Sequence, residues 1–356
     1  MAITASMVKE LRELTGAGMM DCKKALTETN GDMDAAVEVL KKSGAAKAEK
    51  KAARIAAEGI AKVAIDGNTA VVVEVNSETD FVAKNAIFQE FVQAVADKAL
   101  TVDTEKAGDG EDVVSILDMK ADLDDKILKI GEKISIRRFE KVTADVVASY
   151  IHGGGRIGVL VAGNGASDDA AKEALTNIAM QIAAMNPQYI SRADISADAM
   201  AKLKEITVDS ALNAPDTLPK PILNKLIAKA VDGVWSAEDV AIYEEKKSNM
   251  NFLFNFLSKE AKAQLAELAM ADKDAIVADK IFSGLVEGRI SKQVKEISLL
   301  DQVYVKAEDG KQTVAKYLES VNKDLKIVKF VRFEVGEGME KKNEDFAAEV
   351  AKQMNV

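Results

Sequence analysis

The amino-acid sequence predicts an α+β protein in which a helical module precedes two sheet-and-helix layers. Three observations favour this class. Helix-forming Ala, Lys and Glu are abundant, while aromatic residues make up only 5% of the 356 residues. Near residue 56 the spacing of apolar residues changes from that of helices to that of strands. A strand, a tight turn, a second strand and a helix then follow in an order that occurs twice.

The N-terminal residues have the spacing of three short helices that form a compact module. Thr4 is a suitable N-cap for the first helix, whose apolar residues, Leu14 among them, share one face. The Gly-Ala-Gly at 16–18 ends that helix, and the Asn-Gly pair at 30–31 ends the second. Asp32 is expected to cap the third. Because the helices are short, the module should have little core of its own.

A basic segment follows at 41–54, where six Lys or Arg residues stand against one acid, Glu49. The segment is rich in Ala and poor in large apolar residues, so it is predicted to be a partly helical linker. A contact with nucleic acid is the alternative. The net charge of −10 argues against nucleic acid as a main partner of the chain, because phosphate binding depends on Lys and Arg.

A first layer is predicted from residue 56 onward. Apolar, β-branched strands at 63–65 and 71–75 flank an Asp-Gly-Asn turn, which is typical of a hairpin. A helix with apolar residues at helical spacing begins near Ile87, and a strand at 134–140 closes the layer. This order predicts a sheet that contains a hairpin and is covered by helices.

The same order then returns in a second layer. Strand patterns at 149–153 and 157–161 precede a helix around Ile178, and the sequence at 330–334 resembles that at 136–140. A weak internal duplication is the simplest explanation and predicts two related subdomains. Coincidental similarity between two hairpins is the alternative.

The stretch between the second helix and its closing strand is predicted to be a helical insertion. It is rich in helix formers, with breakers at three Pro residues within 215–221 and at Gly233. The aromatic cluster at 252–256 implies that part of the insertion packs, either as a satellite core, which is favoured, or as a surface for a partner. The predicted domains are 1–55, 56–141, 142–190 with 289–335, 191–288, and a C-terminal helical module at 336–356.

Residue counts and motifs exclude several classes of site. Cys22 is the only cysteine and His152 the only histidine, so no disulfide, metal site, cofactor or imidazole-based enzyme is expected. The glycine-rich segment 153–158 matches the dinucleotide-binding fingerprint, but that fingerprint requires a helix after the glycines and here a strand follows. The segment is therefore predicted to be a hairpin turn rather than a nucleotide site, and no small-molecule substrate is expected. No apolar run approaches about 18 residues and no signal-peptide core is present, so we expect a cytoplasmic protein without membrane contact.

The most informative residues are Asp80 and Phe81, an acid beside a large aromatic between a valine-rich strand and a helix. A loop there would present both side chains, and a lone carboxylate is a poor metal site. The pair is therefore interpreted as a wedge for a protein partner. Met19 and Met20 fit either a pliable contact surface or a core. His152, beside a glycine turn, is interpreted as a contact residue rather than a general base.

Four segments closely resemble bacterial elongation factor Ts. They are 7–26, Thr-Asp-Phe-Val-Ala-Lys at 79–84, the stretch around 152–161, and Arg-Phe-Glu-Val-Gly-Glu-Gly at 332–338. The resemblance implies a guanine-nucleotide exchange factor for the GTPase elongation factor Tu. It also implies an N-terminal module like a ubiquitin-associated three-helix fold, a core of two related subdomains, and no covalent step.

The resemblance also implies roles for individual residues. Asp80 and Phe81 would intrude on the partner's G domain near its Mg²⁺ site, and His152 would meet the partner's third domain. A C-terminal helix around Phe346 would lean on the G domain. The partner-contacting residues predicted in this way are Arg12, Met19, Met20, Lys23, Thr79, Asp80, Phe81, Val82, His152 and Phe346.

Two other classes stay open. A ubiquitin-associated-like module joined to a repeated core also suits an adaptor or chaperone-like protein without exchange activity. An enzyme is more remote, because neither repeat shows paired catalytic groups. The chain departs from the family between 190 and about 280, where a longer helical segment stands in place of a short helical hairpin. That segment is predicted to form an extra bundle away from Phe81.

Overall fold

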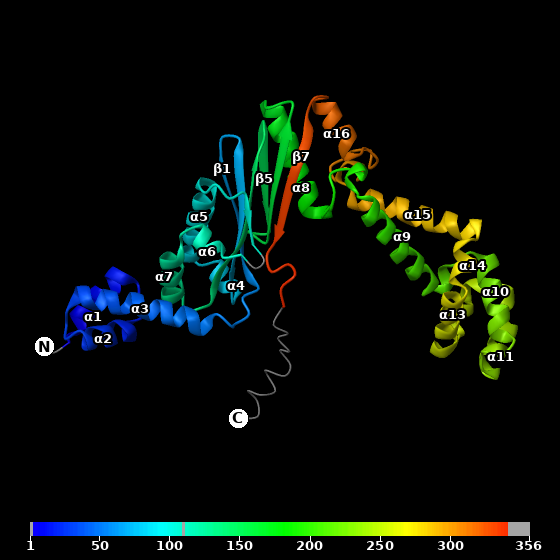
Figure 1. Cartoon of the computed structure of the whole chain (residues 1–356), viewed down its shortest axis with the longest axis horizontal. Helices are drawn as coiled ribbons and strands as arrows, with labels where there is room; N and C mark the ends of the chain where they lie inside the picture. The colour runs from blue at the N-terminus through cyan, green and yellow to red at the C-terminus, as the bar shows by residue number, and fades with distance from the viewer. Residues whose placement is uncertain (1–2, 109–110, 341–356) are drawn as a thin grey trace. The chain divides into compact units, whose positions relative to one another are not determined.

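The computed structural model describes residues 3–108 and 111–340. It combines helices with two antiparallel sheets, which confirms the predicted α+β class. The chain divides into two compact units (Figure 1). The first unit consists of Met1–Asn186 and Tyr304–Val356, and the second consists of Pro187–Val303. The predicted C-terminal helix falls largely on 341–356, which lie outside the described residues.

The N-terminal module consists of helices α1 (Ala5–Thr15), α2 (Met19–Glu28) and α3 (Met33–Lys51). As predicted, the side chains of Thr4 and Asp32 accept hydrogen bonds from the backbone at the starts of α1 and α3. The apolar core of the module also includes Leu128 from another helix, α7 (Lys120–Ile130). The small module therefore completes its core with a residue from the adjoining layer.

Helix α3 runs on through the segment predicted to be a linker and ends only at Lys51. The helix packs against α7, with Gly44 close to the backbone carbonyl of Asp124. The Lys51 ammonium donates to the carbonyl of Gly131, just after α7. The Ala- and Lys-rich sequence favours a helix, and packing against α7 supplies the tertiary stabilisation that an isolated helix does not have, so the segment is helical nearly throughout.

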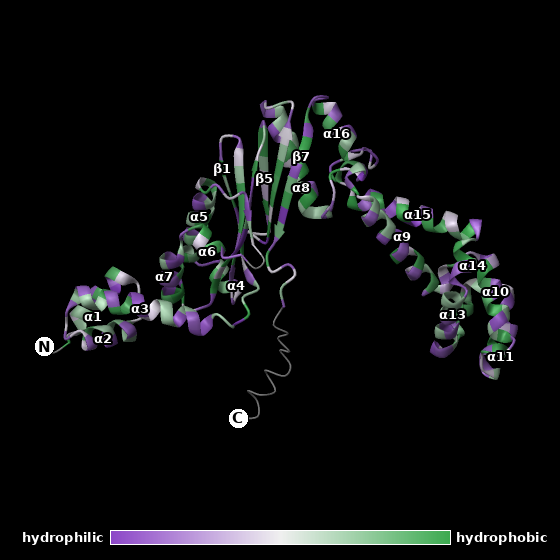
Figure 2. Cartoon of the chain, viewed as in Figure 1, coloured by the Kyte–Doolittle hydropathy of each residue, from purple (hydrophilic) through white to green (hydrophobic). Residues whose placement is uncertain are grey.

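The first sheet has the strand order β1-β2-β4-β3. Helices pack on it in Figure 1, and their apolar faces enclose a core around Phe88 and Phe139. Figure 2 shows hydrophobic residues concentrated along the strands. The elements are β1 (Glu58–Asp66), β2 (Thr69–Ser77), α4 (Asp80–Ala83), α5 (Ala86–Thr101), β3 (Lys106–Ala107), α6 (Val113–Ile116), α7 and β4 (Ile134–Thr143).

The second sheet repeats this design with the order β5-β6-β7. Each sheet begins with an antiparallel hairpin, and a helix and a returning strand follow. Gly153, Gly154 and Gly155 all have positive φ in the tight turn of the second hairpin, which confirms that this glycine-rich stretch is a turn. The elements are β5 (Val146–His152), β6 (Ile157–Asn164), α8 (Asp169–Met185), α16 (Val314–Val321) and β7 (Lys326–Glu334).

A buried carboxylate joins the two sheets. Glu74 on β2 is 0% exposed and accepts hydrogen bonds from Arg137 Nη1 at 3.1 Å and Arg138 Nε at 2.6 Å, both on β4. It also accepts from the backbone N–H of Gly336, just after β7, at 2.8 Å. Since Gly336 follows the last strand of the second sheet, these bonds connect the end of that sheet to the first.

The second unit is entirely helical apart from one bridge, at which Tyr189 pairs with Ser298. This pairing brings its two ends together, so the unit extends beyond residues 191–288. Figure 2 shows hydrophobic and hydrophilic residues alternating along α9, α10 and α13, as amphipathic helices require. The elements are η1 (Arg192–Asp194), α9 (Ala197–Leu212), η2 (Pro215–Thr217), α10 (Lys220–Val231), α11 (Ala237–Lys246), η3 (Lys247–Asn249), α12 (Met250–Phe256), α13 (Lys259–Ala271), α14 (Lys273–Val277), α15 (Lys280–Ile297) and η4 (Leu299–Asp301).

This unit has an apolar core of its own, as expected of a satellite core. Leu226 and Leu265 are buried in it, and Trp235 donates its indole N–H to the carbonyl of Ala261 at 3.1 Å. The aromatic cluster is divided between core and surface. Phe254 is half-buried and packs against the core beside the buried Leu253, whereas Phe252 and Phe256 are exposed. Among the described residues, no helix is long and apolar enough to cross a membrane.

Candidate protein-interaction site

Phe81 is the most exposed large hydrophobic side chain of the described residues, at 79%. It is carried by α4, a helix of four residues between β2 and α5. The sequence predicted a loop at this point, whereas the structure has a single helical turn there. On that turn the ring of Phe81 faces solvent, while Val82 is buried in the core beneath the first sheet. Val82 therefore anchors the turn in the core, and its neighbour Phe81 is exposed to solvent.

Asp80 and Lys84 form an ion pair across α4. The Lys84 ammonium donates to a carboxylate oxygen of Asp80 at 2.9 Å and lies 5.9 Å from the centroid of the Phe81 ring. This hydrogen bond holds the pKa of Asp80 below its ordinary value, so the carboxylate is ionised at neutral pH. Both partners are exposed, so the pair contributes little to stability and is free to exchange partners.

The segments on both sides of α4 are held by side-chain hydrogen bonds. Downstream, Asn85 caps α5 by accepting from the N–H of Ile87 at 2.9 Å. Upstream, the hydroxyl of Thr79 donates to Glu132 Oε1 at 2.7 Å. Thr79 and Val82, which are also predicted as partner contacts, help to hold the turn in place, since Val82 is buried and Thr79 is bonded to Glu132. Of the four predicted contacts at 79–82, Asp80 and Phe81 are the exposed ones.

A second exposed apolar surface lies on the N-terminal module. Met19 and Met20 are the first two residues of α2 and are 56% and 74% exposed. Leu14, which the sequence placed on the buried face of α1, is 68% exposed instead. Arg12 and Lys23 are also exposed, and Lys23 stands one turn after Met19 on the same face of α2. These residues form an apolar surface with basic neighbours, which is the composition of a protein contact.

Leu14 has the apolar spacing of the other residues of α1 but is exposed rather than part of the module's core. Its spacing from Leu11 fits the buried face of α1, but α1 ends at Thr15 and the chain turns at Gly16 with a φ of 68°. The side chain in that last turn is therefore exposed rather than buried in the module. Its position in the last turn of the helix, two residues before the Gly-Ala-Gly break, is the local signal for this exposure.

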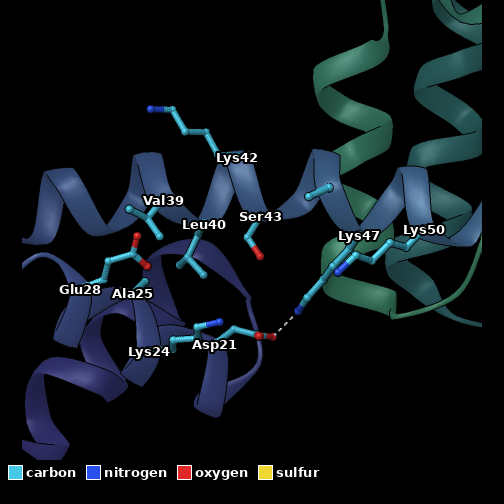
Figure 3. A pocket seen from close by; sticks show the side chains of 11 residues that line it. Asp21, Lys24, Ala25, Glu28, Val39, Leu40, Lys42, Ser43, Lys47 and Lys50 are labelled. Atoms are coloured by element: carbon cyan, nitrogen blue, oxygen red, sulfur yellow. Dashed lines mark ion pairs between the residues drawn. The ribbon is translucent and has the colours of Figure 1, made fainter.

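A basic groove of about 440 Å³ lies between α2 and α3, shown in Figure 3. Lys47 reaches from α3 to Asp21 on α2, with 2.8 Å between the ammonium and the carboxylate. In the described part of the chain Lys24, Lys42 and Lys50, which also line the groove, have no ion-pair partner. The groove therefore has more ammonium groups than carboxylates. Three of its four lysines, Lys42, Lys47 and Lys50, come from the segment 41–54, for which a nucleic-acid contact was the alternative.

The other predicted residues lie elsewhere in the first unit or outside the description. His152 is exposed at the end of β5, and its Nδ1 lies 3.1 Å from the hydroxyl of Tyr150. The Tyr150 hydroxyl and the His152 ring together form a small polar patch at the end of β5. Phe346 lies outside the described residues. Within 3–108 and 111–340, no group of three or more His, Cys, Asp or Glu side chains is arranged to hold a metal ion.

The only thiol is not a reactive centre in this arrangement. Cys22 is buried in the core of the N-terminal module, and burial raises the pKa of its thiol. The exposed candidate residues described above have aromatic, aliphatic or singly charged side chains rather than a reactive thiol.

Comparison with known proteins relates this chain to one family. A family model described as elongation factor TS matches residues 78–337, more than half of the chain. The chain is similar to elongation factor Ts of Clostridioides difficile (strain 630), with 42% identity over 360 residues, and to that of Clostridium novyi (strain NT), with 40% identity over 372. Each alignment covers 99% of this chain and 99% of the relative, so the long helical segment is shared with these relatives.

Proposed function

The chain belongs to the elongation factor Ts family of translation elongation factors, and from this we propose that it binds elongation factor Tu in the cytoplasm and accelerates release of GDP from that GTPase. The partner is a protein, and neither a small-molecule substrate nor a cofactor takes part. The chain's own contribution is binding energy, not bond chemistry.

The thermodynamic reason is linkage. A factor that binds the nucleotide-free GTPase more tightly than the GDP-bound form weakens GDP binding by the same coupling free energy. The factor must therefore make contacts that compete with the nucleotide or its Mg²⁺. GTP then rebinds and expels the factor by the same coupling.

The observation that supports this function most is the exposed ring of Phe81 on an anchored turn. An aromatic that is 79% exposed, beside an ionised carboxylate, would bury much apolar area on entering a crevice of the partner. Asp80 would release Lys84 and place its charge near the site of the Mg²⁺ ion. Disturbing the groups around that ion loosens its hold on the GDP phosphates.

The other exposed surfaces would supply the affinity. Met19 and Met20 with Leu14 form an apolar surface that adapts to a partner helix, since methionine side chains are flexible. His152 would contact a further part of the GTPase. Several separate contacts on one chain raise the affinity for the nucleotide-free form without changing the chemistry at Phe81.

A fluorescent GDP analogue released from elongation factor Tu tests this function. Wild-type protein should accelerate release in proportion to its concentration until saturation. Phe81→Ala should lower the apparent second-order rate constant about thirtyfold, because truncating a central aromatic anchor costs about 2 kcal/mol. Its thermal unfolding should stay unchanged, since the ring is exposed.

Phe252→Ala is the matched control, because Phe252 is also an exposed phenylalanine but belongs to the second unit. It should exchange nucleotide like the wild type. If the wild type binds the GTPase without accelerating release, the adaptor alternative replaces the exchange function. If Phe81→Ala is as active as the wild type, the wedge mechanism is wrong although exchange itself stands.

A further inference from the structure

We infer that Glu132 is a positioning residue for Phe81, acting through the two residues that precede α4. The inference rests on the proposed function, because it concerns how the exchange wedge is held. Glu132 lies in the turn between α7 and β4, far in sequence from the Asp80-Phe81 motif. Its carboxylate faces the backbone that leads into α4.

Helix α4 needs support from outside itself. A helix of four residues has almost no hydrogen bonds to offset the entropy of fixing its backbone, so it would not keep its shape alone. Thr79 stands at its N-cap, but among the described residues its hydroxyl makes no capping bond to the helix. The hydroxyl donates to Glu132 instead. A residue that could cap α4 is thus used to tie the helix to a neighbouring turn.

The carboxylate of Glu132 accepts three hydrogen bonds from the segment before Phe81. Oε2 accepts from the backbone N–H groups of Glu78 and Thr79, at 3.1 Å and 3.0 Å. Oε1 accepts from the Thr79 hydroxyl at 2.7 Å. Hydrogen bonds to an ionised acceptor are the strong ones, and three of them fix both the position and the direction of the chain as it enters α4.

The turn and the segment are bonded in the reverse direction as well. The Glu78 carboxylate accepts from the backbone N–H of Lys133 at 2.6 Å and from Arg54 Nη1 at 3.1 Å. Each segment therefore contributes a carboxylate to the other's backbone. This reciprocal pair of carboxylates, Glu78 and Glu132, is called the clamp below.

The same turn also holds the end of α3. The Lys133 ammonium donates to the carbonyls of Ala52 and Arg54 at 2.7 Å and 2.8 Å, and the Lys51 ammonium donates to the carbonyl of Gly131. Turn 131–133 is therefore bonded both to the chain leaving the N-terminal module and to the chain entering α4. These bonds do not pass through Glu132, so its replacement should affect Phe81 and leave the attachment of α3 in place.

Exchange kinetics separate positioning from general stability. The plateau of the GDP-release rate at saturating factor measures how well the bound wedge acts, and the half-saturating concentration measures binding. We expect Glu132→Ala to lower the plateau about tenfold, since small misplacements of an acting group have large effects on rate, with a much smaller change in half-saturation. Glu132→Gln keeps one oxygen for the two backbone N–H groups and should recover part of the rate.

Two comparisons keep this test specific. Glu319→Gln makes the same chemical change at an exposed position on α16 and should leave both parameters unchanged. Thr79→Val removes only the hydroxyl donor and should lower the plateau less than Glu132→Ala does. Thr79→Val also tests the clamp if Glu132→Ala does not fold. If Glu132→Ala and Thr79→Val both give the same plateau as the wild type, the inference is wrong.

A double-mutant cycle tests whether Glu132 acts through Phe81. If it does, the variant that combines Glu132→Ala with Phe81→Ala should be no slower than Phe81→Ala alone. Multiplied losses would mean that Glu132 acts on exchange by another route, and the inference would be wrong. If Phe81→Ala alone had no effect, the proposed wedge would fail and this cycle would report nothing about Glu132.

A measurement on the free protein covers that last case. In a Trp235→Phe background, which removes the only native tryptophan, Phe81→Trp places a fluorescent ring on α4. Glu132→Ala should then give a larger fast component in its anisotropy decay, because the turn is no longer held. An unchanged decay overturns the inference whatever the exchange assay shows.

Discussion

Phe81 and Glu74 lie in the same layer and have opposite surroundings. The Phe81 ring is 79% exposed, so it contributes little to folding and is available for a partner. Glu74 is 0% exposed, and its charge is matched by Arg137 and Arg138. A buried charge is tolerated only while its partners are in place, whereas an exposed ring can be removed without a cavity. The two side chains therefore divide function and stability between them.

Glu74→Ala should destabilise the first unit by about 3–5 kcal/mol, because it removes the buried carboxylate that pairs with both Arg137 and Arg138. Hydrogen exchange of the amides in β2 and β4 measures this loss. Glu58→Gln is the control, since Glu58 on β1 pairs with Arg156 at the surface, where both side chains are more than 40% exposed, and should cost less than about 1 kcal/mol. Similar losses in the two variants would contradict the role given to the buried carboxylate.

Helices α3 and α15 each contain glycine, but in different surroundings. A Cβ at Gly44 on α3 would lie 3.2 Å from the carbonyl oxygen of Asp124 and 3.5 Å from Leu128 Cβ. A Cβ at Gly288 on α15 would meet nothing within 4 Å. Gly44 therefore permits the close approach of α3 to α7, and through it the helix continues beyond the module. Gly288 has no such contact.

Gly288→Ala should stabilise the second unit by about 1 kcal/mol, the usual difference between the two residues inside a helix. Gly44→Ala should give no such gain, because crowding against Asp124 offsets the better helix propensity. Urea unfolding followed by Trp235 fluorescence measures the first, and hydrogen exchange of the α3 amides measures the second. An equal gain at both positions would show that α3 and α7 do not pack as described.

The whole chain consists of two units, each with its own apolar core. The second unit encloses Trp235, the only tryptophan, which is 7% exposed. Tryptophan fluorescence therefore reports on that unit alone. The first unit has a separate core around its first sheet, to which the buried Val71 belongs. Separate cores predict separate unfolding transitions, so one midpoint does not describe the chain.

Leu226→Ala should lower the free energy of unfolding seen by Trp235 fluorescence by about 2–4 kcal/mol, since the side chain is 2% exposed in the core of the second unit. Val71→Ala, in the first unit, should leave that transition unchanged. If Val71→Ala shifted the tryptophan transition as much as Leu226→Ala, the two units would unfold as one.

Much of the site was predictable because its signals are local. The Asp80-Phe81 pair and the methionines stand out in the sequence, and both are exposed in the structure. Val82 and Thr79 were predicted as contacts together with them. Nothing in their immediate neighbours shows that one is buried and the other is bonded to Glu132. Such roles depend on residues that are distant in sequence.

The sequence by itself determined the α+β class, the caps at Thr4 and Asp32, the glycine turn of the second hairpin and the repeated strand order. Periodicity, capping and turn chemistry act over a few residues and can be read directly. Only the tertiary structure decided that α3 continues to Lys51, that Leu14 is exposed and that the clamp holds the chain entering α4. Each of these features depends on whether an element elsewhere in the chain packs against the residue or bonds to it. A local sequence pattern does not contain that information.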